Sequence, residues 1–361
     1  MTGVIDLHCD SVKFLQAGRD LRLPNPEGHV DLPRLRAGGV GVQIFAAFVA
    51  SSTPEEGAFA AAREMLDRID GFIASCPDEL VKVETAADCR TAGINGKIGV
   101  LAAVENGWAI QESLEKLEAL RLRGVRMLTL VHSRDLPWAA SCTGASPGSG
   151  LSPFGREVVR EMNCLGMIVD LSHAAESVFR EVLRLSRKPV VASHSCAHAL
   201  CPSPRNLTDH QLRALADAGG LVGVCFFPAF LSDSYRLALD RECADIFAEI
   251  DGIEKRYAAD PPGLLSEYLR LNTRLAARLA DIAVPLSMIA DHIDHAVRVA
   301  GVEAVALGSD FDGIFSTPRG VSGCDFYPAL EAELLRRGYS REDWEKISNG
   351  NFLRLLAAQD G

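Results

Sequence analysis

The residues Val4-Ile5-Asp6-Leu7-His8-Cys9-Asp10 set the pattern that decides the fold, a short apolar and partly β-branched run that ends in polar side chains. Runs of the same kind recur at residues 40–45, 98–104, 125–131, 167–171, 189–192, 221–227 and 304–308. Continuous apolar runs of this length are typical of strands that are buried on both faces, as in a parallel sheet. The sequence therefore predicts eight such strands.

Helical patterns lie between the predicted strands. After Ser52-Thr53-Pro54-Glu55-Glu56, apolar residues recur at spacings of three and four as far as residue 73, and we expect a hydroxyl side chain to cap this helix. Residues 153–165 and 208–218 repeat the pattern, the second with Thr208 as its cap. This alternation of strand and helix predicts an α/β protein with a (β/α)₈ (TIM) barrel fold.

One stretch interrupts the alternation. Residues 228–303 separate the seventh and eighth predicted strands and contain helical patterns at 264–282 and 288–299. An excursion of this length at the end of a strand lies on the catalytic face of a barrel, so we expect a lid or a wall that sets specificity. No internal repeat or linker divides the chain, and residues 1–361 are predicted to form a single domain.

The composition excludes several classes of protein. Of the 361 residues, 48% are hydrophobic and 24% charged, as in a globular protein, and a net charge of −11 without a Lys/Arg run argues against nucleic acid as a partner. No apolar run reaches the ~20 residues that span a bilayer, and we recognise no signal peptide or lipid-anchor tail. We therefore expect a cytoplasmic protein without membrane contact. The 10 cysteines include no CxxC pair, which excludes a structural zinc knuckle.

Histidines and acids gather at the ends of the predicted strands. The strands numbered one, three, four, five, six and eight end at or just before His8, Glu105, His132, His173, His194 and Asp310. In a barrel these ends converge on one face. A single histidine there is more often a hydrogen-bonded interior imidazole than a ligand. Four histidines and two acids at the same end are hard to explain in that way, and they predict one shared site.

The residue types indicate that this site holds metal ions. Alternation along a strand sends His8 and Asp10 to one face and Cys9 to the other, so both ligand side chains reach one ion. Glu105 follows seven apolar residues, and a carboxylate there needs a cation or hydrogen-bond donors to offset its desolvation.

A second ion fits the remaining strand-end residues. The two oxygens of Glu105 allow it to bridge two metals, and His173 and His194 complete the second site. Carboxylate and imidazole ligands suit zinc or a similar divalent ion, and two such ions hold a bridging hydroxide. The other histidines have simpler interpretations. We expect surface or cap positions for His29 and His210, and a place outside the site for His198. We expect His292 and His295 to pack or to form hydrogen bonds.

Eight motifs of this chain resemble those of the membrane (renal) dipeptidase family. They occur in order from residue 4 onward and extend the resemblance to about residue 355. The motifs are Val4-Ile5-Asp6-Leu7-His8-Cys9-Asp10, Ala103-Val104-Glu105-Asn106-Gly107, Leu128-Thr129-Leu130-Val131-His132, Gly166-Met167-Ile168-Val169-Asp170-Leu171-Ser172-His173, Ala192-Ser193-His194-Ser195, Pro204-Arg205-Asn206-Leu207-Thr208-Asp209, Asp291-His292-Ile293-Asp294-His295 and Gly308-Ser309-Asp310-Phe311-Asp312-Gly313.

The resemblance implies an amidohydrolase-type barrel of the metal-dependent hydrolase class with two zinc ions per chain. It implies cleavage of dipeptides, with tolerance of a D-residue at the C-terminal position. The metal ligands carried over are His8 and Asp10 on one zinc, His173 and His194 on the other, and Glu105 bridging them. A different divalent ion and a homodimer both stay open.

The resemblance also implies the residues that handle substrate. Arg205 offers a planar fork of donors to a dipeptide's free carboxylate, and His132 donates to the scissile carbonyl oxygen as it becomes an oxyanion. Asp310 is the acid that moves the proton from the attacking water to the leaving amine. Asp312 is its rival, and Asp310 is preferred because it comes first off the strand.

Two other functions stay open at this point. The same metal site could hydrolyse another amide or ester, such as an N-acyl amino acid or a lactone, because barrels change substrate through their loops. A catalytically dead binding protein would have lost a ligand or Asp310, and neither is lost. Many relatives carry Asn directly after the histidine that corresponds to His132, whereas this chain has Ser133, so we expect the floor of its substrate pocket to differ.

Overall fold

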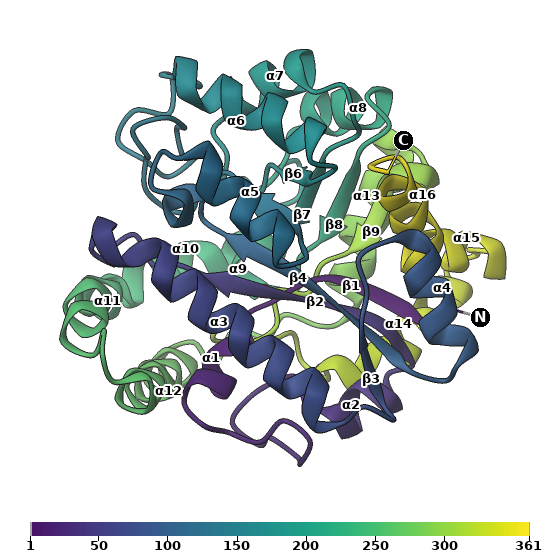
Figure 1. The fold of residues 1–361 in the computed structure, drawn as a ribbon. Coiled ribbons are helices and arrows are strands. Elements are labelled where there is room, and N and C mark those ends of the chain that lie inside the picture. The colour runs from purple at the N-terminus through teal and green to yellow at the C-terminus, as the bar shows by residue number, and fades with distance from the viewer. Residues whose placement is uncertain (1, 361) are drawn as a thin grey trace.

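A computed structural model describes residues 2–360 and closes eight parallel strands into a barrel (Figure 1). The ring runs β2-β1-β9-β8-β7-β6-β5-β4, and pairing of β4 with β2 closes it. Its strands are β1 (Val4–Cys9), β2 (Val40–Phe48), β4 (Ile98–Glu105), β5 (Val125–Thr129), β6 (Ile168–Asp170), β7 (Val191–Ser195), β8 (Leu221–Val224) and β9 (Val305–Leu307). All eight predicted strands are confirmed, and so is the (β/α)₈ fold.

A ninth strand, β3 (Leu80–Lys82), was not predicted. It pairs with the start of β4 outside the ring. With three residues, of which only Leu80 is buried, it is too short to produce an apolar run in the sequence.

Helices surround the barrel, as Figure 1 shows. Their bounds are α1 (Val12–Gln16), α2 (Leu32–Ala37), α3 (Glu55–Ser75), α4 (Ala86–Ile94), α5 (Leu114–Leu122), α6 (Pro153–Cys164), α7 (Glu176–Leu185), α8 (Asp209–Asp217), α9 (Pro228–Leu231), α10 (Asp233–Glu242), α11 (Ala244–Arg256), α12 (Pro261–Arg278), α13 (Ser287–Ala300), α14 (Tyr327–Arg336), α15 (Arg341–Glu345) and α16 (Asn351–Ala357). Short 3₁₀ turns occupy Gly107–Ile110, Val302–Ala304 and Cys324–Phe326, and a π-helical turn occupies Lys346–Gly350. No helix within residues 2–360 is long and apolar enough to cross a membrane.

The helix starts agree with the sequence in one case and differ in another. The Thr208 hydroxyl accepts a hydrogen bond from Gln211 N, and Gln211 Oε1 in turn accepts one from Thr208 N, so α8 begins as predicted. The hydroxyl cap predicted for α3 is wrong, because Pro54 precedes the helix and no side chain caps it. The Ser52 hydroxyl donates instead to the carboxylate of Glu254 on α11.

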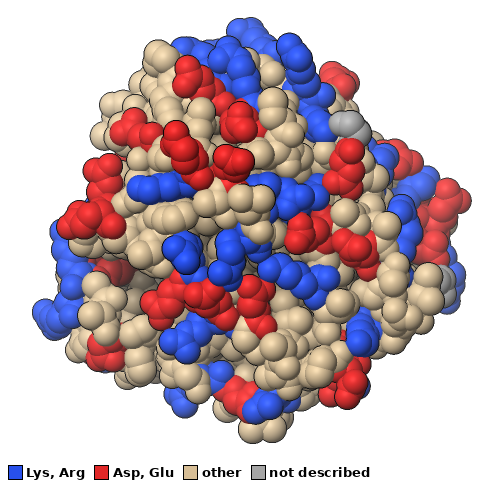
Figure 2. Space-filling model, in the orientation of Figure 1, with Lys and Arg blue, Asp and Glu red and all other residues tan. Residues whose placement is uncertain are grey.

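The barrel interior is a packed core rather than a channel. Its apolar side chains come mainly from alternate positions of the strands, such as Ile5, Leu7, Val42, Ile44, Leu101, Ala103 and Met127, and α16 adds Phe352 and Leu356. A second and larger cluster fills the space between the strands and the helices. Acidic and basic side chains are interspersed over the face of the molecule drawn in Figure 2.

Helices α9 to α13 occupy the long excursion between β8 and β9, where the sequence predicts two helical patterns. The predicted stretch 264–282 corresponds to α12, which begins earlier because the side chain of Asp260 caps it at Gly263 N. The stretch 288–299 corresponds to α13. Helices α11 and α12 line the cavity described next, which gives the excursion its place beside the site.

Candidate active site

The carboxyl ends of the barrel strands bring the predicted site residues together. His8 lies in β1, Glu105 ends β4 and His194 lies in β7, whereas His132, His173 and Asp310 follow β5, β6 and β9. A cavity of about 420 Å³ opens at this end, and Asp10, Glu105, His132, His173, Arg205 and Asp310 are among the residues that line it.

The local backbone at the strand ends directs these side chains inward. In β1, Ile5 and Leu7 pack inside the barrel, and within the register irregularity between Asp6 and Cys9 the His8 ring lies against Asp10 and Glu105. Cys9 packs with the outer, helix-facing cluster, as predicted, although regular alternation from Ile5 and Leu7 would direct it inward. His173 and Asp310 follow their strands with φ of +68° and +62°, in the left-handed region that non-glycine residues rarely adopt.

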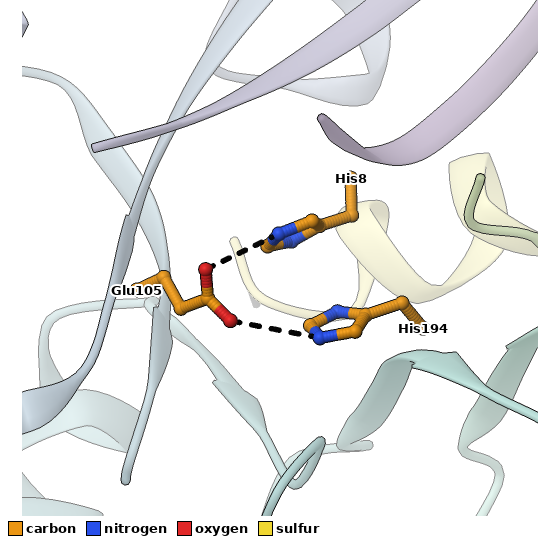
Figure 3. Close-up of side chains that lie close together, drawn as sticks. All are labelled: His8, Glu105 and His194. Atoms are coloured by element: carbon orange, nitrogen blue, oxygen red, sulfur yellow. Dashed lines mark ion pairs between the residues drawn. The ribbon is translucent and has the colours of Figure 1, made fainter. Parts of the chain in front are cut away.

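Glu105 lies between two groups of side chains. Its Oε2 is 3.4 Å from His8 Nε2, which is itself 3.4 Å from Asp10 Oδ2. Its Oε1 is 3.1 Å from His173 Nε2 and 3.6 Å from His194 Nε2. Figure 3 shows the His8 and His194 rings directed at opposite oxygens of this carboxylate. The structure thus brings the predicted ligand residues together, with His8 nearer one oxygen of Glu105 and His173 and His194 nearer the other.

The donor set fits divalent metal ions. Buried His8 Nδ1 and Nε2, Asp10 Oδ1 and His173 Nδ1 have no hydrogen-bond partner in the structure, and unpartnered buried polar atoms are costly. Three triplets of ligand atoms each lie within 4.8 Å of one another, namely His8/Glu105/His194, Glu105/His132/His173 and His8/Asp10/Asp310. Imidazole and carboxylate ligands are the chemistry that zinc and its neighbours prefer. The triplets also place His132 and Asp310 within reach of an ion, which the sequence-based ligand set did not include.

Burial and charge set the protonation of these groups. Burial lowers the pKa of His173 and His194 well below the ordinary value, so both rings are neutral and offer a lone pair. Burial opposes ionisation of Glu105, but the charge of His8 and the His173 ring, whose Nε2 lies 3.1 Å from Oε1, hold the pKa of Glu105 well below its usual range. His173 and His194 beside an ionised Glu105 are therefore in the state that binds a metal cation. His8 differs, because the charges of Glu105 and Asp10 outweigh its burial and raise the pKa of His8 well above its ordinary value, so His8 must release a proton when an ion binds.

A layer of polar side chains beneath the site fixes the orientation of His194. Ser193 Oγ lies 2.8 Å from His194 Nδ1 and donates to Asp170 Oδ2 at 2.7 Å. Asp170 also accepts hydrogen bonds from Thr129 Oγ1 and from the main-chain N–H groups of Ser172 and Ser193. The sequence analysis did not identify Asp170 as a positioning residue, although an acid inside a buried strand was the available signal.

The two rival acids have different surroundings. Asp312 accepts hydrogen bonds from Ser11 Oγ at 2.5 Å and from His29 N at 2.7 Å, and these partners overcome burial and lower the pKa of Asp312. Asp310 has only a weak contact, 3.7 Å from Cys225 Sγ, and burial together with the charges of Asp10 and Glu105 raises the pKa of Asp310 to about 8. Asp312 is therefore fixed as an ionised hydrogen-bond acceptor, whereas the carboxyl group of Asp310 faces the cavity with a raised pKa.

The substrate-contact candidates lie on the same cavity. Arg205 is buried, its Nη2 donates to the His194 carbonyl at 3.1 Å, and its guanidinium lies 5.2 Å from the centre of the Phe230 ring. No acid of residues 2–360 forms an ion pair with Arg205. The His132 ring packs between Phe48 and His173 in tilted contacts, and burial lowers the pKa of His132.

The remaining histidines divide as follows. His29 is not a surface or cap residue as predicted, because its ring accepts a hydrogen bond from Asp312 N at 3.0 Å and packs on Phe311. His210 is exposed, as expected. His292 bonds Ala197 N and the Leu231 carbonyl, and His295 lies 2.7 Å from Asp209, so their predicted hydrogen-bonding roles are confirmed. His198 lines a separate cavity of about 220 Å³ behind His173 and Arg205.

Comparison with known proteins identifies relatives over the whole chain. The family model described as membrane dipeptidase (peptidase family M19) matches residues 1–360. Dipeptidase 3 of Homo sapiens is 32% identical over 346 residues, which are 94% of this chain and 60% of that protein. Dipeptidase aclJ of Aspergillus oryzae is 34% identical over 338 residues, 91% of this chain and 69% of that protein. This chain thus spans about 60% of the length of dipeptidase 3.

Solved structures agree with this relationship. The probable dipeptidase PvdM from Pseudomonas aeruginosa superposes with a TM-score of 0.82 at 26% identity, covering 99% of this chain and 95% of the other. A metallopeptidase from Rhodobacter sphaeroides, liganded with a phosphinate mimic of the dipeptide L-Ala-D-Ala, superposes with a TM-score of 0.80 at 27% identity, covering 99% of each chain.

Proposed function

This chain belongs to the membrane dipeptidase family, peptidase family M19, and we propose that it hydrolyses dipeptides with the help of two divalent metal ions. The observation that carries the proposal is the position of Glu105. One of its oxygens faces His8 and the other faces His173 and His194, so a single carboxylate serves two neighbouring groups of ligand atoms.

The proposed metal ligands are the side chains on either side of the Glu105 carboxylate. His8 and Asp10 hold one ion, His173 and His194 hold the other, and Glu105 contributes to both. Zinc is the ion we propose, because imidazole and carboxylate donors suit it. When bound, a pair of such ions polarises a carbonyl and lowers the pKa of water enough to supply hydroxide at neutral pH.

Side chains of the cavity supply the rest of the chemistry. Arg205 binds the C-terminal carboxylate of the dipeptide, since its guanidinium has no acidic partner within residues 2–360. His132 donates a hydrogen bond to the scissile oxygen as negative charge develops there. Asp310 takes a proton from the attacking water and passes it to the leaving amine.

Support for a D-residue at the C-terminal position comes from a relative. The Rhodobacter sphaeroides metallopeptidase binds a mimic of L-Ala-D-Ala. We propose that this chain also accepts dipeptides that end in a D-residue, with Arg205 as the anchor of the terminal carboxylate.

A substrate panel on the zinc-loaded protein tests this function. The panel contains L-L and L-D dipeptides, the corresponding N-acetyl amino acids and simple lactones. We expect kcat/KM to be highest for dipeptides and both amino acids to be released. A higher kcat/KM for a lactone or an N-acyl amino acid would instead support the alternative function of the same site.

A further inference from the structure

Helices α11 and α12 supply one wall of the cavity, and that wall carries an acid without a cationic partner. Phe247, Ile250 and Glu254 follow one another along one face of α11, and Tyr268 and Leu271 face them from α12. The wall is otherwise apolar or aromatic, apart from Asp251 and Asn272. A carboxylate in such a place is a candidate for recognising part of a substrate.

The contacts of Glu254 hold its carboxylate in place without neutralising it. Ser52 Oγ donates to Oε2, and the Tyr268 hydroxyl donates to Oε1 at 2.9 Å. Burial and the charge of Glu254 raise the pKa of Tyr268, so the phenol stays a donor. Among the ion pairs of residues 2–360 none includes Glu254, whereas Asp251, one turn earlier, pairs with Arg134.

The barrel topology places Glu254 opposite Arg205. Arg205 follows β7 and donates to the carbonyl of His194 in that strand, whereas Ser52, which holds Glu254, follows β2. In the ring of eight strands, β2 and β7 are separated by three strands on either side. A dipeptide anchored by its C-terminal carboxylate at Arg205 therefore extends its N-terminal residue toward Glu254.

We propose that Glu254 selects dipeptides whose N-terminal residue carries a cationic side chain, as arginine or lysine does. This inference rests on the proposed dipeptidase function. The aliphatic stem of such a side chain would pack on Ile250 and Phe247, while its charged end meets the Glu254 carboxylate beside Tyr268.

The α-ammonium group is the other cation of a dipeptide, and it is less suited to Glu254. It is two bonds from the scissile carbonyl carbon and must stay near Glu105 and Asp10. Glu254 makes no hydrogen bond or ion pair with any proposed metal ligand within residues 2–360. Lys13 is a cation on the same side of the cavity, but its Nζ donates to the main-chain carbonyl of Asp312.

The test compares L-Arg-L-Ala with L-Met-L-Ala, which has an uncharged side chain of similar shape. On the zinc-loaded protein we expect the ratio of their kcat/KM values to favour L-Arg-L-Ala at least roughly tenfold, and Glu254→Gln to reduce that ratio by roughly 10–100-fold. The glutamine amide oxygen still accepts from one of the two hydroxyls, and its NH₂ group donates to the hydroxyl oxygen of the other, so the side chain keeps its place. Glu254→Lys should invert the preference toward L-Glu-L-Ala.

Glu249→Gln is the matched control. Glu249 lies on α11, where it pairs with Arg270 and Arg274 and does not line the cavity. Its replacement by glutamine changes the net charge of the helix by the same amount as Glu254→Gln. We expect Glu249→Gln to keep the wild-type ratio of kcat/KM for L-Arg-L-Ala to kcat/KM for L-Met-L-Ala. An equal loss for both substrates in Glu254→Gln, or no preference in the wild type, overturns this inference and leaves the dipeptidase function standing. Failure to cleave any dipeptide would overturn both.

Discussion

The Nε2 atoms of His173 and His194 lie 3.0 Å apart. His194 Nδ1 faces the Ser193 hydroxyl, whose own proton is donated to Asp170, so the ring proton of His194 sits on Nδ1 and leaves Nε2 bare. Burial lowers the pKa of both rings, so neither carries a positive charge. Two neutral imidazoles that direct nitrogen atoms at the same point, beside an ionised Glu105, form a place for a cation.

The first prediction concerns Ser193. Ser193→Ala removes the acceptor that orients His194, and loss of such a partner typically costs 10–100-fold in metal affinity. We expect zinc titration against a competing chelator to show a loss of this size for one of the two ions. The control is Ser195→Ala, because the Ser195 hydroxyl is buried without a partner and its removal should leave zinc affinity unchanged. Equal affinities in Ser193→Ala and wild type would contradict the orienting role.

The second prediction separates the two acids at the end of β9. Asp310→Asn keeps the shape of the side chain but cannot accept a proton, so kcat for dipeptides should fall by roughly 10²–10⁴-fold. Elemental analysis should show that the ions are retained. Asp312 is held by Ser11 and His29, so Asp312→Asn should mainly lower the free energy of unfolding. If Asp312→Asn alone abolished turnover while Asp310→Asn did not, the assignment would be reversed.

The third prediction concerns the clamp for the substrate carboxylate. Arg205→Ala should lower kcat/KM for dipeptides by the value of a charge-assisted hydrogen bond, about 1.5–3 kcal/mol or roughly 10–150-fold. Hydrolysis of the same dipeptide with an amidated C-terminus should change little, because the amide offers no charge to the guanidinium. Equal losses on the two substrates would make Arg205 structural and favour the amidase or lactonase alternative.

The fourth prediction concerns the pH dependence of stability. His292 is buried between Ala197 N and the Leu231 carbonyl, and burial lowers its pKa to about 4. The unfolded chain binds this proton below about pH 6.5 and the folded chain only below about pH 4, so lowering the pH between these values favours unfolding. This difference between the unfolded and folded pKa of His292 corresponds to roughly 3 kcal/mol of unfolding free energy.

His292→Gln keeps a donor and an acceptor but removes the titration. Urea denaturation of the metal-free protein at about pH 7 and about pH 4.5 should therefore show a smaller loss of unfolding free energy in the variant than in wild type. Parallel losses in the two proteins would show that His292 does not contribute to the acid sensitivity.

The sequence predicted the barrel because its signal is long and repetitive. Each of the eight strands is buried on both faces, and the apolar runs at 98–104 and 221–227 need no tertiary information to be recognised. The strand β3 escaped because three residues at the edge of a sheet carry no period. The α3 cap was mispredicted because Ser52 finds a partner, Glu254, that is 202 residues away.

The site was predictable to the extent that its residues end strands. Glu105, His8, His173 and His194 were found in this way. The structure places the three histidines around the Glu105 carboxylate. His29 was misplaced because its partner Asp312 lies 283 residues away in the sequence. Glu254 was missed because it lies in a part of the helical excursion that carries none of the recognised motifs, and only the fold brings it to the cavity.

The metal content of the protein shows whether the ligand groups on either side of Glu105 hold two ions. After reconstitution with zinc and removal of free ions by gel filtration, elemental analysis should find about two zinc ions per chain, and a chelator should abolish dipeptide hydrolysis. Glu105 contacts both ligand groups, so Glu105→Ala should lose most of both ions. A zinc content near zero in the wild type, with hydrolysis unaffected by the chelator, would contradict the account.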